Sequence, residues 1–138
     1  MKKLFTISVS LLIIVLFVTA CATKLSVKEM AVNPSQVSAG DEVVSYVTLN
    51  KYSDQVASVK ATVREYPEYS FTLNNDGEEG DEEAGDNIWS KKMAIPWNAP
   101  AQTYHLDISI LDEEGNIIAR KKGEEVSERS GTISIEIE

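Results

Sequence analysis

The segment from Asn74 to Asn87 holds the residues best suited to chemistry. It reads NNDGEEGDEEAGDN, and half of its residues are Asp or Glu. Protein-bound calcium takes about six to eight oxygen ligands from carboxylates, side-chain amides, backbone carbonyls and water. If the segment folds back on itself, its spaced side-chain oxygens can converge on one ion. The sequence therefore contains a candidate calcium site, with Asn74, Asp76, Asp81 and Asp86 as ligands.

The same segment also has an explanation that needs no ion. Asp and Asn side chains bond to backbone amides two residues further on and so stabilise tight turns. Gly77, Gly80 and Gly85 permit the positive φ angles that such turns require. An EF-hand spaces its carboxylates at alternating positions before its glycine, whereas residues 74–77 compress them. The sequence is therefore compatible with both a calcium site and a turn stabilised by its own side chains.

Catalytic groups are scarce in the rest of the chain. His105 is the sole histidine, so a Ser-His-Asp triad would have to use it. The strand pattern around His105 indicates a solvated face instead. No G-x-S-x-G, P-loop or G-x-G-x-x-G motif occurs. We therefore expect a protein without enzymatic activity.

Aromatic residues in predicted loops form a second set of candidates. Trp97 lies in the loop IPWNAP, and Tyr66 and Tyr69 flank Pro67 in EYPEYS. Aromatic rings at loop tips stack on sugars or anchor protein partners. We expect Trp97, Tyr66 and Tyr69 to be binding residues for an envelope protein or a glycan. The alternative for Trp97 is packing against the end of the domain.

The N-terminus has the features of an export signal. Two lysines precede an almost entirely apolar run at residues 4–18, and small residues follow it. The run is shorter than the ~20 apolar residues of a membrane-spanning helix. Cys21 comes next and is the only cysteine of the chain. An internal disulfide is therefore excluded, and a lone cysteine in an exported chain calls for another role.

The sequence VTAC at residues 18–21 resembles the lipobox of bacterial lipoproteins. The resemblance implies that residues 1–20 are a signal peptide that is removed. It also implies that Cys21 carries acyl chains such as palmitate, with residues 21–24 as a short tether. Several acyl chains hold a protein stably on a bilayer. We expect the protein to be anchored to a bacterial membrane on its extracytoplasmic side, in the periplasm or at the cell surface.

The charge balance limits the partners. The chain has 22 acidic and 13 basic residues, a formal net charge of −9, and two of its lysines lie in the signal. Nucleic-acid binding requires clustered Lys and Arg. We therefore expect no nucleic-acid partner, and contact with the membrane only through the lipid anchor.

The remaining residues 25–138 predict an all-β domain. Apolar and polar residues alternate in short runs between turn residues, and no window has a sustained helical period. Seven or eight such strands predict an antiparallel β-sandwich of the immunoglobulin or fibronectin III type. Tyr104 follows a Pro-containing loop and is a candidate tyrosine corner. The expected strands are residues 25–32, 42–50, 56–65, 69–73, 88–95, 103–111, 117–121 and 133–137.

Two segments resemble bacterial immunoglobulin-like domains of the choice-of-anchor X type. They are LNNDGEEGDEEAGDNIWS and PAQTYHLDISILDEEGN, within residues 71–118. The resemblance implies an extracytoplasmic binding or spacer module and no particular reaction. We expect a lipid-anchored binding or accessory module. The alternative is a calcium-dependent ligand-binding or adhesion module that uses residues 74–87.

Overall fold

The computed structural model of this 138-residue chain describes residues 24–75 and 85–138. The predicted signal, Cys21, Asp76 and Asp81 lie outside the described residues. Within the two described ranges all regular structure is β-strand. No helix in these ranges is long and apolar enough to cross a membrane.

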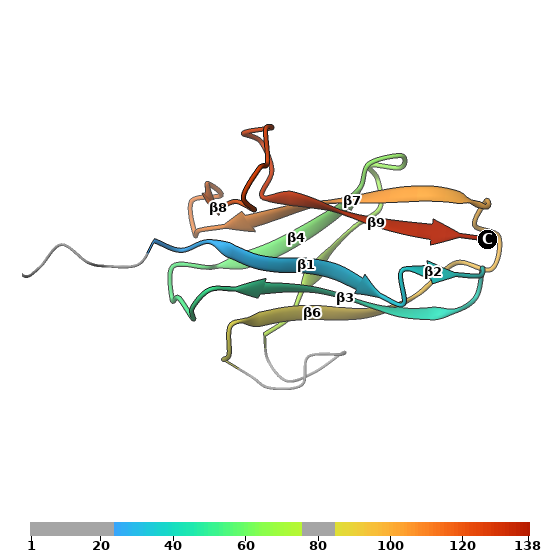
Figure 1. The fold of residues 1–138 in the computed structure, drawn as a ribbon, viewed down its shortest axis with the longest axis horizontal. Helices are drawn as coiled ribbons and strands as arrows, with labels where there is room; N and C mark the ends of the chain where they lie inside the picture. The colour runs from blue at the N-terminus through green and yellow to red at the C-terminus, as the bar shows by residue number, and fades with distance from the viewer. Residues whose placement is uncertain (1–23, 76–84) are drawn as a thin grey trace, which may run out of the picture.

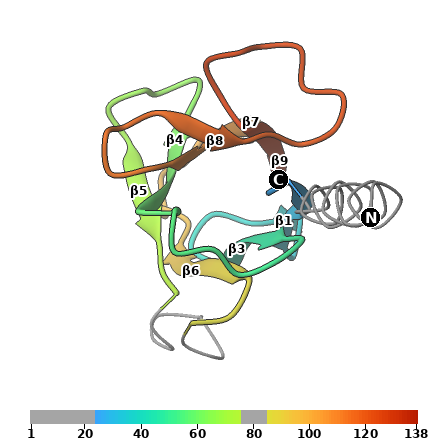
Figure 2. The same cartoon turned by 90° about the vertical axis from the view of Figure 1, so that its left-hand side faces the viewer.

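Two sheets pack face to face (Figures 1 and 2). One has the order β1-β3-β6, and the other β2-β9-β7-β4-β5 with β8 beside β7. The strand pairs are antiparallel except for β2 with β9, which is parallel. The predicted all-β, immunoglobulin-like sandwich is thus confirmed. The strands of the described ranges are β1 (Val27–Asn33), β2 (Gln36–Val37), β3 (Glu42–Leu49), β4 (Ser58–Val63), β5 (Ser70–Leu73), β6 (Ile88–Ala94), β7 (Gln102–Leu111), β8 (Ile117–Ala119) and β9 (Gly131–Ile137).

Period-two alternation places the core between the sheets. Successive side chains of a strand point to opposite faces, so every second residue of β7 and β9 is buried. Ile108 and Ile110 of β7 and Val59 of β4 are fully buried. Burying one such side chain contributes ~1.5–3 kcal/mol. In a chain without an internal disulfide, this burial is the main source of stability.

The short strand β2 was not predicted. The chain leaves β1 at Asn33 and then pairs with β9 in the opposite sheet, at Gln36 beside Glu136. Pro34 has no N–H and cannot continue the β1 ladder. Two residues are too few for a periodic pattern, so sequence reasoning placed no strand here.

Tyr104 forms the predicted tyrosine corner. Its hydroxyl donates to the carbonyl oxygen of Pro100, four residues upstream, at 2.9 Å. The ring is buried where β7 begins. The bond fixes the loop between β6 and β7 against the second sheet.

The sandwich depends on residues after the predicted tether. The buried core of the described residues runs from Leu25 to Ile137, and every strand named above pairs within that range. A chain of residues 22–138 therefore contains every described strand and every residue of this core.

Candidate functional site, an apolar pocket between the sheets

The two sheets meet at one point along their β5 and β6 edges. Beyond β5, the amide of Asn74 donates to the carbonyl of Ser90 on β6 at 2.7 Å, and the Ser90 amide donates back at 3.0 Å. The bridge is antiparallel, so β5 before Asn74 and β6 after Ser90 extend to the same side of it. The sheets diverge toward Phe71 on β5 and Met93 on β6, and the space between them is a pocket.

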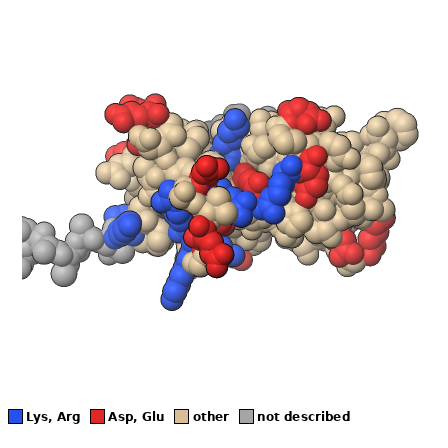
Figure 3. All heavy atoms as spheres, turned by 90° about the horizontal axis from the view of Figure 1, so that it is seen from above, with Lys and Arg blue, Asp and Glu red and all other residues tan. Residues whose placement is uncertain are grey.

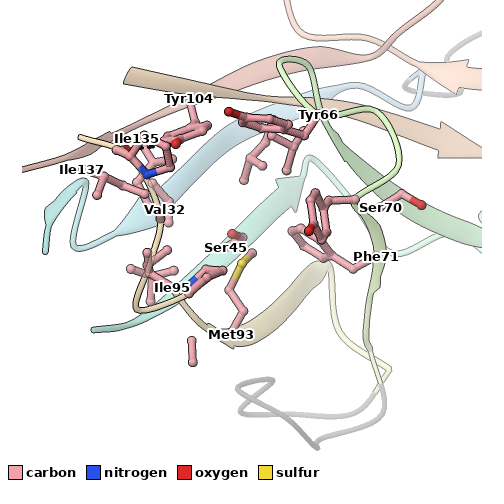
Figure 4. Close-up of a pocket in the computed structure, with 18 of the residues that line it drawn as sticks. Val32, Ser45, Tyr66, Ser70, Phe71, Met93, Ile95, Tyr104, Ile135 and Ile137 are labelled. Carbon is pink, nitrogen blue, oxygen red and sulfur yellow. Dashed lines mark hydrogen bonds between the residues drawn. The ribbon is translucent and has the colours of Figure 1, made fainter. Parts of the chain in front are cut away.

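The pocket has a volume of about 630 Å³. Ligand sites in proteins typically measure ~300–1,000 Å³ and are largely apolar with a few polar groups. Figure 4 shows side chains from both sheets around it. The first sheet contributes Val43, Ser45 and Met93, and the second contributes Phe71, Leu106 and Ile135.

Three tyrosines lie at one side of the pocket. The rings of Tyr66 and Tyr69 stand edge to face with centroids 6.4 Å apart. The Tyr66 ring lies 6.1 Å from that of Tyr104. Aromatic pairs at such separations are favourable. Tyr66, which lies beside Tyr104 in Figure 4, thus connects the buried tyrosine corner with the exposed ring of Tyr69.

The turn that carries two of these tyrosines is held by backbone bonds. The amide of Val63 donates to the Tyr69 carbonyl at 2.9 Å, which closes the turn between β4 and β5. Inside it, the Tyr66 amide donates to Val63 at 3.1 Å and the Tyr69 amide to Tyr66 at 2.9 Å. These bonds fix the positions from which both rings extend.

The loop between β6 and β7 forms the other side. The amide of Ile95 donates to the Asp41 carbonyl at 2.7 Å, and the amide of Gly40 donates to the Ile95 carbonyl at 2.9 Å. The Ala99 amide donates to Pro96 at 3.0 Å within the loop. Both sides of the pocket are therefore preformed, which reduces the ordering cost of binding.

Ser45 is the unusual residue of the pocket wall. It lies on β3 in the buried row that contains Val43 and Val47, and its side chain is 0% exposed. In the part of the chain that the structure describes, its hydroxyl oxygen is one of two buried side-chain polar atoms without a hydrogen-bond partner. Figure 4 shows the hydroxyl directed from β3 into the pocket, beside Met93. Ser45 thus places one buried, unpaired polar atom in the wall, whereas the other polar lining residues Glu68, Ser70 and Asn98 are exposed.

The pocket carries little charge. Among the described residues that line it, Glu68 in the β4–β5 turn is the one charged side chain, and it is exposed. The Tyr104 phenol remains a neutral donor, since burial raises its pKa and the neighbouring Tyr66 raises it further. Neither lysine nor arginine belongs to this lining.

The predicted aromatic candidates separate into two groups. Tyr66 and Tyr69, 38% and 63% exposed, line the pocket. Trp97 is 85% exposed and lies in the β6–β7 loop without lining the pocket. At this exposure Trp97 does not pack against the sandwich end.

Sequence reasoning missed Ser45. The signal was present, because the inward row of the predicted strand 42–50 reads Val43, Ser45, Val47, Leu49. A serine in such a row marks a position where the core is interrupted. A single serine in a strand does not by itself indicate a pocket, because the divergence of the sheets cannot be read from the sequence.

The described part of the acidic segment forms turns. Asp86 Oδ1 accepts the amide of Ile88 at 2.9 Å, two residues further on. The Asn75 side-chain amide donates to the Asp86 carbonyl at 2.8 Å, and the Gly85 amide donates to the Asn75 carbonyl at 3.1 Å. Asn74 belongs to the bridge with Ser90. Asp86 thus has the turn-bracing role.

Two of the four proposed calcium ligands, Asp76 and Asp81, lie outside the described residues. No group of three or more His, Cys, Asp or Glu side chains that could hold a metal occurs in residues 24–75 and 85–138. The calcium site stays a prediction.

The outer face of the second sheet carries an ionic cluster. Asp107 accepts hydrogen bonds from Arg64 at 2.7 Å, from Thr132 at 3.1 Å and from Arg129 at 3.4 Å. Figure 3 shows acidic and basic side chains side by side in the middle of this view. Desolvation raises the pKa of Asp107, but the hydrogen bonds and charges of its partners lower it by more, and the net shift is downward.

His105 belongs to the same face. Its Nδ1 lies 2.5 Å from Glu65 Oε1, and its backbone amide donates to Glu65 Oε2 at 3.0 Å. Desolvation raises the pKa of Glu65, and the bonds from His105 lower it by more. His105 thus lies on the outer face, as expected, with a partly exposed side chain whose ring is held by a carboxylate. This pair faces away from the pocket core.

Comparison with known proteins supports the fold class. No protein-family model and no curated protein matches the sequence. A Niemann-Pick type C2 protein from Japanese carpenter ant has a similar structure, with 12% identity and a TM-score of 0.50 over 86% of this chain and 96% of that one. The alkylpurine DNA glycosylase AlkC of Pseudomonas fluorescens, solved with DNA containing an abasic site analog, has 11% identity and a TM-score of 0.46. That match covers 91% of this chain and 33% of the glycosylase, so the chain spans a third of that protein. At 12% identity, the likeness to the Niemann-Pick type C2 protein concerns the fold alone.

Proposed function

We propose that this protein is a lipid-anchored, extracytoplasmic binding module that holds a small apolar molecule between its sheets and catalyses no reaction. The observation that supports this most is the preformed pocket of about 630 Å³. A sandwich without a ligand role fills the space between its sheets with side chains, as this one does around Val59 and Ile110. The pocket between the sheets therefore has room for an occupant.

The placement of the pocket fits a tethered protein. The described chain begins at Lys24, and in Figure 1 this end of the sandwich lies opposite the β4–β5 turn and the β6–β7 loop. If Cys21 carries the lipid, a tether of residues 21–24 spans at most ~15 Å at ~3.3–3.6 Å per residue. The pocket then opens on the side away from the bilayer.

The exposed Trp97 supports a partner at this end. An indole that is 85% exposed in the loop beside the pocket resembles the anchors of protein interfaces and of sugar stacking. An envelope protein or a glycan that contacts Trp97 would sit next to the pocket opening.

A neutral fluorescent apolar probe such as N-phenyl-1-naphthylamine tests the pocket. Residues 22–138 should enhance its fluorescence in a saturable way. Ala99→Trp places an indole in the pocket and should abolish most of this signal, whereas Lys60→Trp adds an indole on the exposed outer face of β4 and should not. Equal binding by wild type and Ala99→Trp, with both variants folded by circular dichroism, would show that the probe binds elsewhere.

The anchor has its own test. The full chain expressed in a bacterium should incorporate labelled palmitate and sediment with membranes. Cys21→Ala should lose the label and the membrane association. An unlabelled wild-type chain that is released as a free protein would refute lipidation without affecting the pocket.

A further inference from the structure

We infer that the pocket ligand is a neutral, mostly apolar molecule that carries one hydroxyl or carbonyl group, and that Ser45 is the residue that binds this group. The inference rests on the proposed function of the pocket. It adds the chemical class of the ligand and the residue that selects it.

The first observation is the unused Ser45 hydroxyl. Its oxygen is fully buried, has no hydrogen-bond partner, and faces the pocket (Figure 4). A hydroxyl both donates and accepts a hydrogen bond. A buried polar group without a partner is destabilising, and a ligand that supplies the partner removes this cost. Either a hydroxyl or a carbonyl oxygen of the ligand meets the requirement.

The second observation is the apolar surrounding of Ser45. Val43, Met93, Ile95 and Ile135 line the same space. Around one polar atom, such walls favour a ligand whose remaining surface is hydrocarbon. In this part of the pocket, away from the exposed Ser70 and Asn98, a sugar or a peptide would leave most of its polar groups without partners.

The third observation concerns charge. The described residues of the lining include neither lysine nor arginine, and Glu68 stands in the β4–β5 turn at the edge of the pocket. Burying an ionised group without a partner is strongly unfavourable. A carboxylate or phosphate would find no cation inside the pocket and would be repelled at its edge. The ligand class is therefore alcohols, ketones and esters rather than fatty acids.

The test uses three ligands of the same chain length, namely decanol, decane and decanoate. Each is titrated into residues 22–138 at neutral pH with the fluorescent probe already bound. We expect decanol to displace the probe at the lowest concentration. Decane should need about three- to tenfold more, the effect of one net hydrogen bond. Decanoate should be weaker than decanol by at least the same factor.

Ser45→Ala should remove the advantage of decanol over decane and leave decane unchanged. Ser70→Ala is the matched control, since Ser70 also lines the pocket but lies exposed at its edge, and the preference should persist in it. Thermal unfolding verifies that both variants are folded. If Ser45→Ala unfolds, comparison of decanol, decane and decanoate on the wild-type protein still decides the ligand class.

The outcomes separate the two proposals. Displacement by all three ligands at equal concentrations, or by decanoate at the lowest, would overturn the inference while the pocket remains a binding site. Absence of both probe binding and displacement would overturn the proposed function and the inference together. A decanol preference that Ser45→Ala leaves intact would overturn the role of Ser45.

Discussion

Two serines in the described part of the chain are fully buried, and they differ in what their hydroxyl groups contact. Ser130 lies just before β9, and its hydroxyl oxygen accepts the amide of Ile110 on β7 at 2.8 Å. Ser45 lies on β3, and its hydroxyl has no partner. Both are 0% exposed. The comparison distinguishes a polar group buried to complete the fold from one whose partner must come from outside.

The role of Ser130 follows from the topology. The ladder between β7 and β9 ends at Ile108 opposite Gly131. One step further, the Ser130 amide donates to the Ile108 carbonyl at 2.7 Å, and the Ser130 carbonyl accepts the Lys121 amide at 2.6 Å. The Ser130 side-chain oxygen then accepts a hydrogen bond from the backbone amide of Ile110. The amide, the carbonyl and the hydroxyl of Ser130 thus each pair a backbone group beyond the end of the β7–β9 ladder.

The largest effect on stability is expected at Ser130. Ser130→Ala leaves the buried amide of Ile110 without its acceptor, and such an orphan costs ~1–3 kcal/mol. Urea unfolding of residues 22–138 should show a lower midpoint with an unchanged m-value. A midpoint equal to that of the wild type would mean that the Ser130 hydroxyl does not support the fold, and the contrast with Ser45 would disappear.

The same substitution at Ser45 should act in the opposite direction. In the folded protein the Ser45 hydroxyl is removed from water and forms no hydrogen bond, which is unfavourable. Without ligand, the Ser45→Ala variant should therefore be more stable than the wild type by about 1 kcal/mol. The rise should be visible in the same urea titration. A loss of stability comparable to that of Ser130→Ala would indicate that Ser45 has a structural bond, and the ligand role would lose its basis.

Some features of the fold can be predicted from the sequence, and the roles of the two serines cannot. Alternation predicted eight of the strands, because apolar residues at every second position are a local signal of a half-buried sheet. Tyr104 was recognisable because its role depends on a carbonyl four residues away. Local signals of this kind can be recognised in a single amino-acid sequence.

The pocket depends on contacts that no local pattern contains. It exists because Asn74 meets Ser90 while Phe71 and Met93 diverge, which is a property of two sheets. The bonding of Ser45 and Ser130 likewise depends on partners in other strands. Tyr66 and Tyr69 were chosen for their loop positions, and the structure places both beside a pocket that the sequence did not predict.

Asp107 extends the comparison to the surface, where a polar group is fully bonded but only partly buried. Its folded-state pKa lies below the ordinary value of ~3.9. The folded chain therefore binds this proton less readily than the unfolded chain. The stabilisation is present at neutral pH and is lost as the pH falls from about 4 toward the folded-state pKa.

Asp107→Asn should lower the free energy of unfolding at neutral pH by roughly 0.5–1 kcal/mol, a small value because Arg64 is 41% exposed and water screens the pair. The difference from the wild type should shrink as the pH is lowered through the acid range, in urea titrations at several pH values. A difference that stays constant with pH would assign the effect to packing rather than to charge.

Among the residues that the structure describes, the other buried side-chain polar atom without a hydrogen-bond partner is Asn75 Oδ1, at the start of the acidic segment. It resembles Ser45 in lacking a partner, but its neighbours in sequence, residues 76–84, lie outside the described part of the chain. Asp86 already uses Oδ1 for the Ile88 amide. The described geometry thus shows Asp86 bracing a turn, and its calcium-ligating role stays a prediction.

Calcium should accordingly produce the smallest effect. We expect the unfolding temperature of residues 22–138 to be the same in millimolar calcium and in chelator at fixed ionic strength. A ligand that binds only the folded state would stabilise it by about 2.7 kcal/mol at a hundredfold excess over Kd, a shift of several degrees for a domain of this size. Such a shift, if lost in Asp81→Ala and in Asp86→Ala, would establish the acidic segment as an ion site. Asn75 Oδ1 would then join Ser45 as a buried oxygen whose partner comes from outside the chain, and the calcium-dependent module would replace the turn as the explanation of residues 74–87.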